Sequence, residues 1–199
     1  MRILILLITL LSYHTLMAQN SMFDVCPLKV GTEIPSSLLY DDTGKEHALK
    51  DLIAERPTVL VFYRGAWCGY CTKHLSELDE AKGQIEEQGY QILGITIDQA
   101  SKLEESRTKS NSEIVVYSDA KAEAIKAFGL DWQVEEETFH KYKNEYKVDL
   151  EEWSGQTHHA LPVPAVFIIK DGIVQFQYVN PNYNTRLKAE TLLAILKTL

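Results

Sequence analysis

Two cysteines separated by two residues are the part of this sequence best suited to chemistry. Cys68 and Cys71 stand in the segment FYRGAWCGYC, after an apolar run and before a stretch with helical periodicity. A sulfur at the start of a helix lies near unpaired backbone N–H groups and the positive end of the helix dipole, which stabilise a thiolate. The spacing therefore predicts a nucleophilic Cys68 thiolate, with Cys71 one turn further on to close a disulfide with it.

Two other uses of the pair have to be weighed. A zinc site needs four ligands, and because the chain has a single Cys-x-x-Cys, the fold would have to recruit Cys26, His158 and His159. A purely structural disulfide over so short a loop would constrain the unfolded chain little. We therefore expect redox chemistry that needs no metal and no organic cofactor. Cys26 is left as a free thiol, an intermolecular partner or a distant resolving group.

The residues around the pair alternate between strand and helix patterns. Residues 58–63 form a β-rich apolar run, as expected for a central strand buried on both faces. From Tyr70 to about Gln88, apolar residues recur every three or four positions, which predicts an amphipathic helix. This alternation continues and implies βαβ units in a mainly parallel sheet; strands are expected at 90–98 and 113–119, and helices at 100–109 and 122–130.

The two ends and one internal segment depart from that rhythm. A turn at 41–44 between short apolar segments predicts an N-terminal β-hairpin, and Asp171-Gly172 predicts a tight hairpin between two late strands, followed by a last helix. The charged segment at about 131–160 is interpreted as an insert, a surface helix followed by a loop. Without internal repeats or low-complexity linkers, a single domain is expected.

Composition and the first residues bear on the compartment. The chain has 199 residues, 45% hydrophobic content and a net charge of −8, which argues against a nucleic-acid surface. Residues 1–18 combine Arg2, a short apolar run and Ala18, which predicts a secretory signal peptide cleaved before Gln19; an uncleaved membrane anchor is the alternative. We therefore expect a periplasmic or secreted domain of residues 19–199 that meets the membrane only through the signal peptide.

A resemblance to a known family rests on three segments. They are VGTEIPSSLLYDDTGKEHAL (30–49), FYRGAWCGYCTKHLSEL (62–78) and LPVPAVFIIKDGIVQFQYVNPNYNTR (161–186). With Pro164 at the start of a late strand, the chain resembles the thioredoxin superfamily and, within it, the peroxiredoxin-like proteins of the alkyl hydroperoxide reductase and thiol-specific antioxidant branch. The resemblance implies an α/β thioredoxin-like fold: a central, mixed and mainly parallel sheet with flanking helices, and the insert placed before a cis-proline strand.

The family pattern is altered around the cysteines. Aligned on Phe62-Tyr63, the family's motif proline falls at Arg64, its threonine at Cys68, its peroxidatic cysteine at Cys71 and its strand-start arginine at Pro164. The resemblance implies an antioxidant thiol peroxidase that reduces hydroperoxides with electrons from a thioredoxin-like donor. The rewritten motif favours a second hypothesis, a thioredoxin-like protein disulfide oxidoreductase of the cell envelope. A non-catalytic exported binding module that uses the insert is the third.

Several neighbours of the sulfurs are candidates for supporting roles. Arg64 is the nearest charged residue and can steady a thiolate or a peroxide oxygen, and His74 follows Cys71 by three positions on the same helix face, where it can assist proton transfer. The buried acid of thioredoxin corresponds to Phe62, so proton transfer at Cys71 requires another group or water. A substrate groove beside the pair is expected to comprise Trp67, Gly69, Tyr70, Val163 and Pro164.

Overall fold

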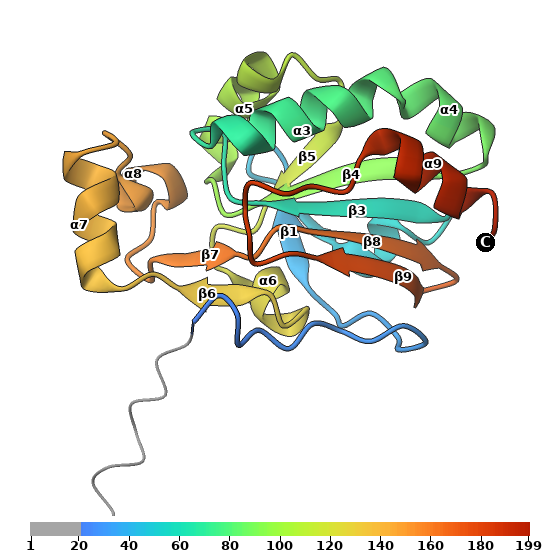
Figure 1. The fold of residues 1–199 in the computed structure, drawn as a ribbon, viewed down its shortest axis with the longest axis horizontal. Helices are drawn as coiled ribbons and strands as arrows, with labels where there is room; N and C mark the ends of the chain where they lie inside the picture. Colours follow the sequence, from blue (N-terminus) through green and yellow to red (C-terminus); the bar gives the residue numbers. More distant parts are fainter. Residues whose placement is uncertain (1–20) are drawn as a thin grey trace, which may run out of the picture.

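A seven-stranded sheet forms the centre of the computed structural model, which describes residues 21–199 (Figure 1). The expected signal peptide, residues 1–18, lies outside the described residues. The strand order is β2-β1-β5-β4-β3-β8-β9. The bounds are β1 (Leu38–Tyr40), β2 (Glu46–Ala48), β3 (Thr58–Tyr63), β4 (Gln91–Thr96), β5 (Val115–Ser118), β8 (Ala165–Lys170) and β9 (Ile173–Val179).

The sheet is mixed, and its parallel part is central. Strands β3, β4 and β5 pair in parallel, whereas β1–β2, β1–β5, β3–β8 and β8–β9 are antiparallel. The α/β class, the N-terminal hairpin and the late hairpin are thus confirmed. The expectation of mainly parallel pairing holds only for the three central strands, because the two hairpins add antiparallel neighbours on both sides.

Helices cover both faces of the sheet. The bounds are α2 (Leu49–Leu52), α3 (Gly69–Glu80), α4 (Lys82–Glu87), the 3₁₀ turn η1 (Ala100–Lys102), α5 (Leu103–Ser110), α6 (Glu123–Ala127) and α9 (Ala189–Leu196). Alternate residues of β3 enter the two cores, Val59 and Val61 on the α3 side and Leu60 and Phe62 on the α6 side. This two-sided burial explains the unbroken apolar run of β3.

The helix expected from Tyr70 to about Gln88 is divided in two. Helix α3 ends at Glu80 and α4 begins at Lys82. Between them, the N–H of Ala81 donates to the carbonyl of Leu78, three residues back, at 3.1 Å. This tighter, 3₁₀-like turn interrupts the α-helical ladder, a feature that apolar spacing alone does not reveal.

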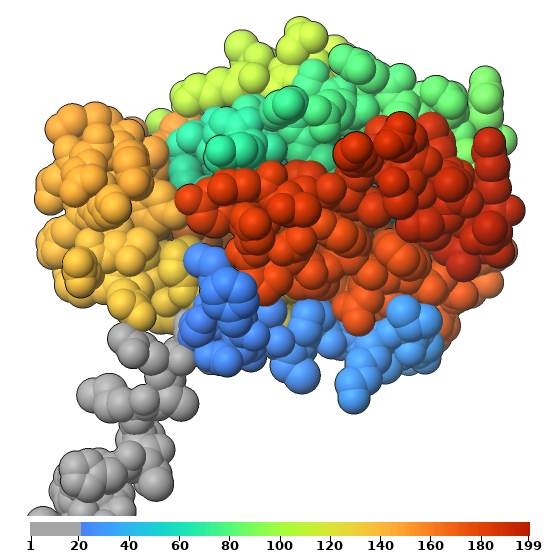
Figure 2. Space-filling model, viewed as in Figure 1, coloured from blue at the N-terminus to red at the C-terminus, as the bar shows by residue number. Residues whose placement is uncertain are grey.

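The insert forms a lobe at the end of the sheet where α3 begins (Figures 1 and 2). It contains β6 (Asp131–Gln133), α7 (Glu136–Asn144), α8 (Leu150–Ser154) and β7 (Ala160–Pro162). Strands β6 and β7 pair antiparallel as a separate two-stranded sheet. The expectation of one helix followed by a loop was incomplete, because Asp149 accepts hydrogen bonds from the N–H groups of Glu151 and Glu152 and so begins a second helix.

The approach to β8 differs from the cis-proline expectation. Pro164 directly precedes β8, as predicted, but its peptide bond is trans, as are all peptide bonds between residues 21 and 199. The chain passes here from the β6–β7 ladder to the main sheet. The Val163 N–H donates to the carbonyl of Leu130 at 2.8 Å, and the carbonyl of Pro164 accepts from Asn180 N–H at 3.2 Å. An extended trans backbone serves both hydrogen bonds.

No helix within residues 21–199 has the length and apolar character that crossing a membrane requires.

Candidate active site

The two cysteines lie at the junction of β3 and α3. Cys68 is the N-cap residue of α3, with extended backbone angles, and its carbonyl accepts from Cys71 N–H at 2.8 Å and Thr72 N–H at 3.1 Å. Both cysteines are unpaired thiols, with Cys68 4% and Cys71 0% exposed. The predicted placement after a central strand and at a helix start is confirmed, and the structure represents the dithiol form.

Each sulfur faces its own arginine. Arg64 Nη2 donates to Cys68 Sγ at 3.4 Å, and Arg186 Nη2 donates to Cys71 Sγ at 3.5 Å. The Arg64 side chain is itself buried, only 5% exposed, so its charge is little screened by solvent. The sequence interpretation of Arg64 as the group that steadies a thiolate agrees with this geometry. Arg186 lies in the loop between β9 and α9, where the segment NPNYNTR carries no sequence signal of chemistry.

The surroundings shift the pKa values of the two thiols in opposite directions. A hydrogen bond from Cys71, the charge and hydrogen bond of Arg64 and the N–H of Cys71 lower the pKa of Cys68 to about 5, although burial opposes them. Burial and the adjacent Cys68 sulfur raise the pKa of Cys71 well above its usual value. At neutral pH the pair therefore holds one thiolate and one thiol, a nucleophile with a proton-bearing partner beside it.

Aromatic side chains from three segments hold the Arg64 guanidinium. Its Nη1 donates to the Tyr142 hydroxyl of α7 at 2.8 Å. Its guanidinium carbon lies 4.0 Å from the ring centroid of Tyr183 and 5.3 Å from that of Trp67. The rings of Trp67 and Tyr142 in turn meet edge to face at 5.6 Å. The arginine is thus bound by hydrogen bonding and cation–π contact on several sides.

A buried carboxyl group supports the loop between β3 and Cys68. Asp98 follows β4, is fully buried, and its Oδ2 accepts from Ala66 N–H at 2.7 Å. Burial raises the pKa of Asp98 to about 7. Gly65 has φ +157°, and a Cβ there would lie 2.3 Å from Trp67 Nε1 and 2.6 Å from Asp98 Oδ1. Only glycine fits this close approach.

Residues of the predicted groove lie next to Arg64 and Tyr183. Trp67 is half-buried, and Gly69 and Tyr70 are exposed on the first turn of α3, where Tyr70 is edge to face with Tyr183 at 6.1 Å. Val163 and Pro164 are buried and line a small cavity together with Arg64 and Tyr183. Its volume, about 10 Å³, holds roughly one water-sized molecule. The groove is therefore a narrow notch beside Arg64.

His74 has a different role from the expected one. Its buried Nε2–H donates to the carbonyl of Leu187 at 3.0 Å, and burial lowers the pKa of His74 to about 4. A neutral imidazole committed to a backbone carbonyl is a poor proton carrier for Cys71. Instead it ties α3 to the loop that carries Arg186, because Leu187 is the next residue.

The remaining candidate ligands of the zinc hypothesis are engaged elsewhere. The ring of His158 meets the carbonyl of Ala120 at 2.8 Å, and that of His159 meets Glu151 at 2.8 Å. Cys26 is exposed in the N-terminal segment. Within the part of the chain that the structure describes, no group of three or more His, Cys, Asp or Glu side chains is arranged to hold a metal ion.

Four residues of the site were not found from the sequence: Asp98, Tyr142, Tyr183 and Arg186. Asp98 carried a signal, because an acid directly after a buried strand lies at the sheet edge where functional groups collect. Tyr142 forms an aromatic stripe at helical spacing with Phe139 and Tyr146 in the charged insert, a pattern that indicates a helix face and no chemistry. The other two follow a run of asparagines and a proline, a pattern that indicates a loop and no more.

Comparison with known proteins decides the family. The family model described as "AhpC/TSA family" matches residues 30–177. The chain belongs to the AhpC/TSA family. The match includes β3, both cysteines and the insert, so this AhpC/TSA protein carries its Cys-x-x-Cys pair and its two-helix lobe inside the family domain.

Individual relatives of this AhpC/TSA protein fall into two named groups. Peroxiredoxin bcp1 of Schizosaccharomyces pombe is 29% identical over 104 residues, 52% of this chain and 53% of that protein. Thiol-disulfide oxidoreductase ResA of Bacillus cereus is 29% identical over 98 residues, 49% of this chain and 56% of that protein. The chain thus spans about half the length of the curated relatives it matches.

Solved structures agree on the fold. Reduced Prx3 from Vibrio vulnificus superimposes with a TM-score of 0.70 at 21% identity, covering 85% of this chain and 99% of that one. Peroxidoxin BcpB from Mycobacterium tuberculosis gives a TM-score of 0.64 at 21% identity, covering 86% and 98%. The AhpC/TSA domain therefore has the thioredoxin-like fold of peroxiredoxins.

Proposed function

We propose that this AhpC/TSA protein is a thiol peroxidase that reduces hydroperoxides through a Cys68–Cys71 dithiol–disulfide cycle. The observation that carries the proposal is the Cys68 sulfur, buried to 4% exposure and bound by the guanidinium of Arg64 at 3.4 Å. A thiolate of this kind is a strong nucleophile at neutral pH. The same guanidinium stabilises negative charge that develops on a peroxide oxygen during the attack.

The first step oxidises Cys68. Its thiolate attacks the terminal oxygen of the hydroperoxide, so that an S–O bond forms while the O–O bond breaks. The sulfur gives up two electrons and becomes a sulfenic acid, which keeps the proton of the hydroperoxide. The other oxygen leaves as an alkoxide, or as hydroxide from hydrogen peroxide, and takes a proton from water.

The second step uses Cys71. Its thiol attacks the Cys68 sulfur, an S–S bond forms, the S–O bond breaks, and the hydroxyl leaves with the Cys71 proton as water. A dithiol donor of the thioredoxin type then returns two electrons by thiol–disulfide exchange. No metal or organic cofactor takes part in this cycle. Arg186, 3.5 Å from Cys71 Sγ, favours the thiolate character that this cysteine needs for its attack.

We assign the attacking role to Cys68, although the resemblance to the family motif places the peroxidatic cysteine at Cys71. Cys68 has the lowered pKa and the remaining exposure, whereas Cys71 is fully buried with a raised pKa. A peroxide reaching the site from solvent therefore meets the thiolate of Cys68 before the thiol of Cys71.

A second candidate function is protein disulfide exchange. The WCGYC motif and the similarity to proteins named thiol-disulfide oxidoreductase ResA favour it. Tyr70, 52% exposed on the first turn of α3, provides a surface that a protein partner can contact. The burial of Cys68 favours the peroxidase, because a small peroxide reaches a nearly covered sulfur more easily than a protein disulfide does.

Stopped-flow oxidation of the reduced protein separates the candidates. Loss of two thiols per chain within seconds in micromolar hydrogen peroxide supports the peroxidase, with Cys68→Ser inert and Cys26→Ser unchanged as the matched control. Indifference to peroxide with fast reduction of a protein disulfide supports the second function. A protein that does neither, yet binds a partner through the insert, is a binding module and refutes both.

We also propose export, to the periplasm or the cell exterior, on the basis of the signal-like residues 1–18. N-terminal sequencing of the protein recovered from its producing cell tests this. A mature chain that starts at Gln19 supports export, and an intact N-terminus in the cytoplasmic fraction contradicts it.

A further inference from the structure

The insert reaches the reactive sulfur through one hydroxyl group. Arg64 Nη1 donates to the Tyr142 hydroxyl at 2.8 Å, while Nη2 of the same guanidinium donates to Cys68 Sγ at 3.4 Å. We propose that Tyr142 is a positioning residue that fixes the Arg64 guanidinium against Cys68, which makes the insert a working part of the active site. The inference rests on the proposed thiol chemistry of Cys68 and deepens it.

The Tyr142 hydroxyl sets the orientation of the Arg64 guanidinium. Arg64 Nε is buried and has no hydrogen-bond partner among the described residues, so the two Nη groups alone carry the directional contacts. The rings of Tyr183 and Trp67 attract the cation without fixing its rotation. Losing the Tyr142 hydroxyl would therefore free the guanidinium to turn within its plane and would weaken its contact with the sulfur.

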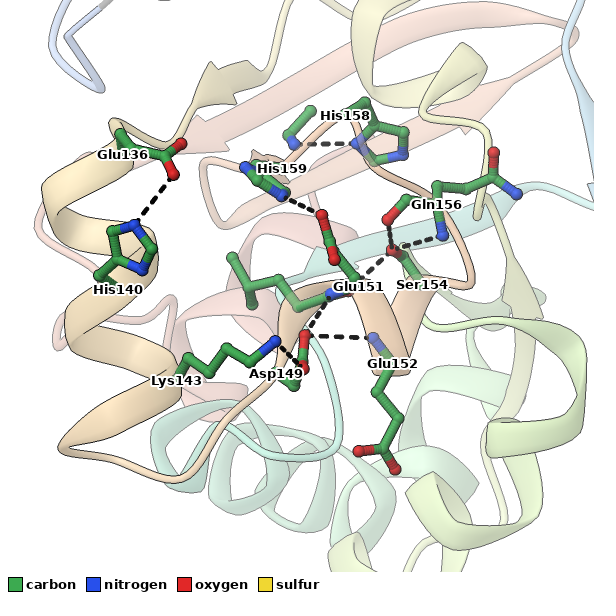
Figure 3. A network of polar contacts seen from close by, with 12 residues as sticks. Glu136, His140, Lys143, Asp149, Glu151, Glu152, Ser154, Gln156, His158 and His159 are labelled. Carbon is green, nitrogen blue, oxygen red and sulfur yellow. Dashed lines mark hydrogen bonds and ion pairs between the residues drawn. The ribbon is translucent and has the colours of Figure 1, made fainter.

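The insert is braced so that it can hold such a position. In Figure 3, Lys143 of α7 pairs with Asp149 at 2.7 Å, and Asp149 caps the start of α8. In the first turn of α8, Glu151 meets His159 at 2.8 Å (Figure 3), and the His159 ring stacks on Phe139 of α7 with centroids 3.8 Å apart. These contacts join α7, α8 and the strand β7 into one unit, from which Tyr142 projects toward Arg64.

The core anchors this unit to the rest of the domain. Phe139, Leu150 and Trp153 are 6%, 2% and 8% exposed and belong to the hydrophobic core on the α6 side of the sheet. The position of the Tyr142 hydroxyl is therefore set by packing across the domain and not by the local chain alone.

Tyr142→Phe is the direct test, because it removes the hydroxyl and keeps the ring that packs on Trp67. Tyr146→Phe is the matched control: Tyr146 follows the end of α7, is 58% exposed, and meets the Tyr142 ring edge to face, whereas the Arg64 contacts come from Tyr142, Tyr183 and Trp67. The measurement is the rate of Cys68 alkylation by iodoacetamide against pH, on reduced protein in which Cys26 is replaced by Ser. No peroxide is present, so the result does not depend on the peroxidase proposal.

The inflection of the alkylation profile reports the pKa of Cys68. We expect Tyr142→Phe to raise the inflection by about one pH unit, a tenfold change in the acid dissociation constant, since weakening a charged hydrogen bond has about this effect. Tyr146→Phe should leave the inflection unchanged. An unchanged inflection in Tyr142→Phe overturns the proposal. Equal shifts in both variants also overturn it, because they would reflect a general loosening of the insert.

Discussion

Replacing Arg64 by glutamine should remove the positive charge that stabilises the Cys68 thiolate. Nη2 of Arg64 lies 3.4 Å from Cys68 Sγ, and both groups are buried. Unit charges about 4 Å apart interact by about 4 kcal/mol at an effective dielectric constant of about 20. One pKa unit corresponds to about 1.4 kcal/mol. The pKa of Cys68, about 5 in the native protein, should therefore rise to about 8 in Arg64→Gln.

The rise in pKa has two opposite effects on reactivity. At pH 6 the thiolate fraction falls from about 90% to about 1%, so alkylation becomes slower. Above pH 9 the variant is almost fully ionised, and because thiolate nucleophilicity increases with pKa, with a Brønsted coefficient of about 0.4–0.5, its plateau rate exceeds that of the native protein by about twentyfold. The two pH profiles should therefore cross.

Iodoacetamide alkylation from pH 4 to 10, followed together with the ultraviolet absorbance of the thiolate, measures both effects. Arg56→Gln, which removes an exposed arginine before β3, is the control for net charge and should reproduce the native profile. If the inflection of Arg64→Gln stays near pH 5, the hydrogen bond from Cys71 and the N–H groups at the start of α3 account for the acidity, and the reasoning about Arg64 is refuted.

Three further predictions concern the same site. Cys71→Ser should stop the cycle at a Cys68 sulfenic acid, which dimedone labels and mass spectrometry detects; a disulfide in this variant would point to Cys26 as the resolving thiol. Asp98→Asn should make the free energy of unfolding less dependent on pH. The pKa of Asp98 is raised to about 7 in the folded state. Ionisation of this carboxyl group therefore lowers the free energy of unfolding of the native protein by roughly 3 kcal/mol as pH rises from about 4 to 7. Urea unfolding at the two pH values measures this change. The same change in unfolding free energy in the native protein and in Asp98→Asn would contradict the prediction. Gly65→Ala should lower the unfolding free energy by about 2–4 kcal/mol, because its Cβ would overlap Trp67 and Asp98, whereas Gly83→Ala, in open space within α4, should raise it by up to about 1 kcal/mol.

The elements that carry the two sulfurs were predictable because their signals are local. The apolar run of β3, the helical spacing after Tyr70 and the Cys-x-x-Cys between them lie within about thirty residues. Arg64 could be found for the same reason, since it is four residues from Cys68. The break at Ala81 could not, because it depends on a hydrogen bond that forms only in the folded chain. The trans bond at Pro164 is the ordinary state of an X–Pro bond, and the cis expectation came from the family resemblance and not from the local sequence.

The other partners of the sulfurs come from distant parts of the chain. Tyr142 is 78 positions from Arg64, and Arg186 is 115 positions from Cys71. Sequence periodicity reports which face of an element is buried, but it carries no information on which buried or half-buried groups meet across elements. For this reason an aromatic stripe in a charged helix, and an arginine after a run of asparagines, gave no sign of a role in the site.

The β6–β7 ladder has a consequence for how the domain can be altered. Gln133 and Ala160 are paired neighbours on adjacent strands, so the chain leaves and re-enters at nearly one point. A short hairpin turn could join these two residues in place of α7 and α8, if polar residues also replaced the core side chains that the loss of Phe139, Leu150 and Trp153 would uncover. The lobe is in this sense an exchangeable module: a trimmed domain would retain both sulfurs and lose the hydroxyl on Arg64, and lobes of other sequence grafted at the same junction would give a series of thiols of graded acidity on one unchanged scaffold.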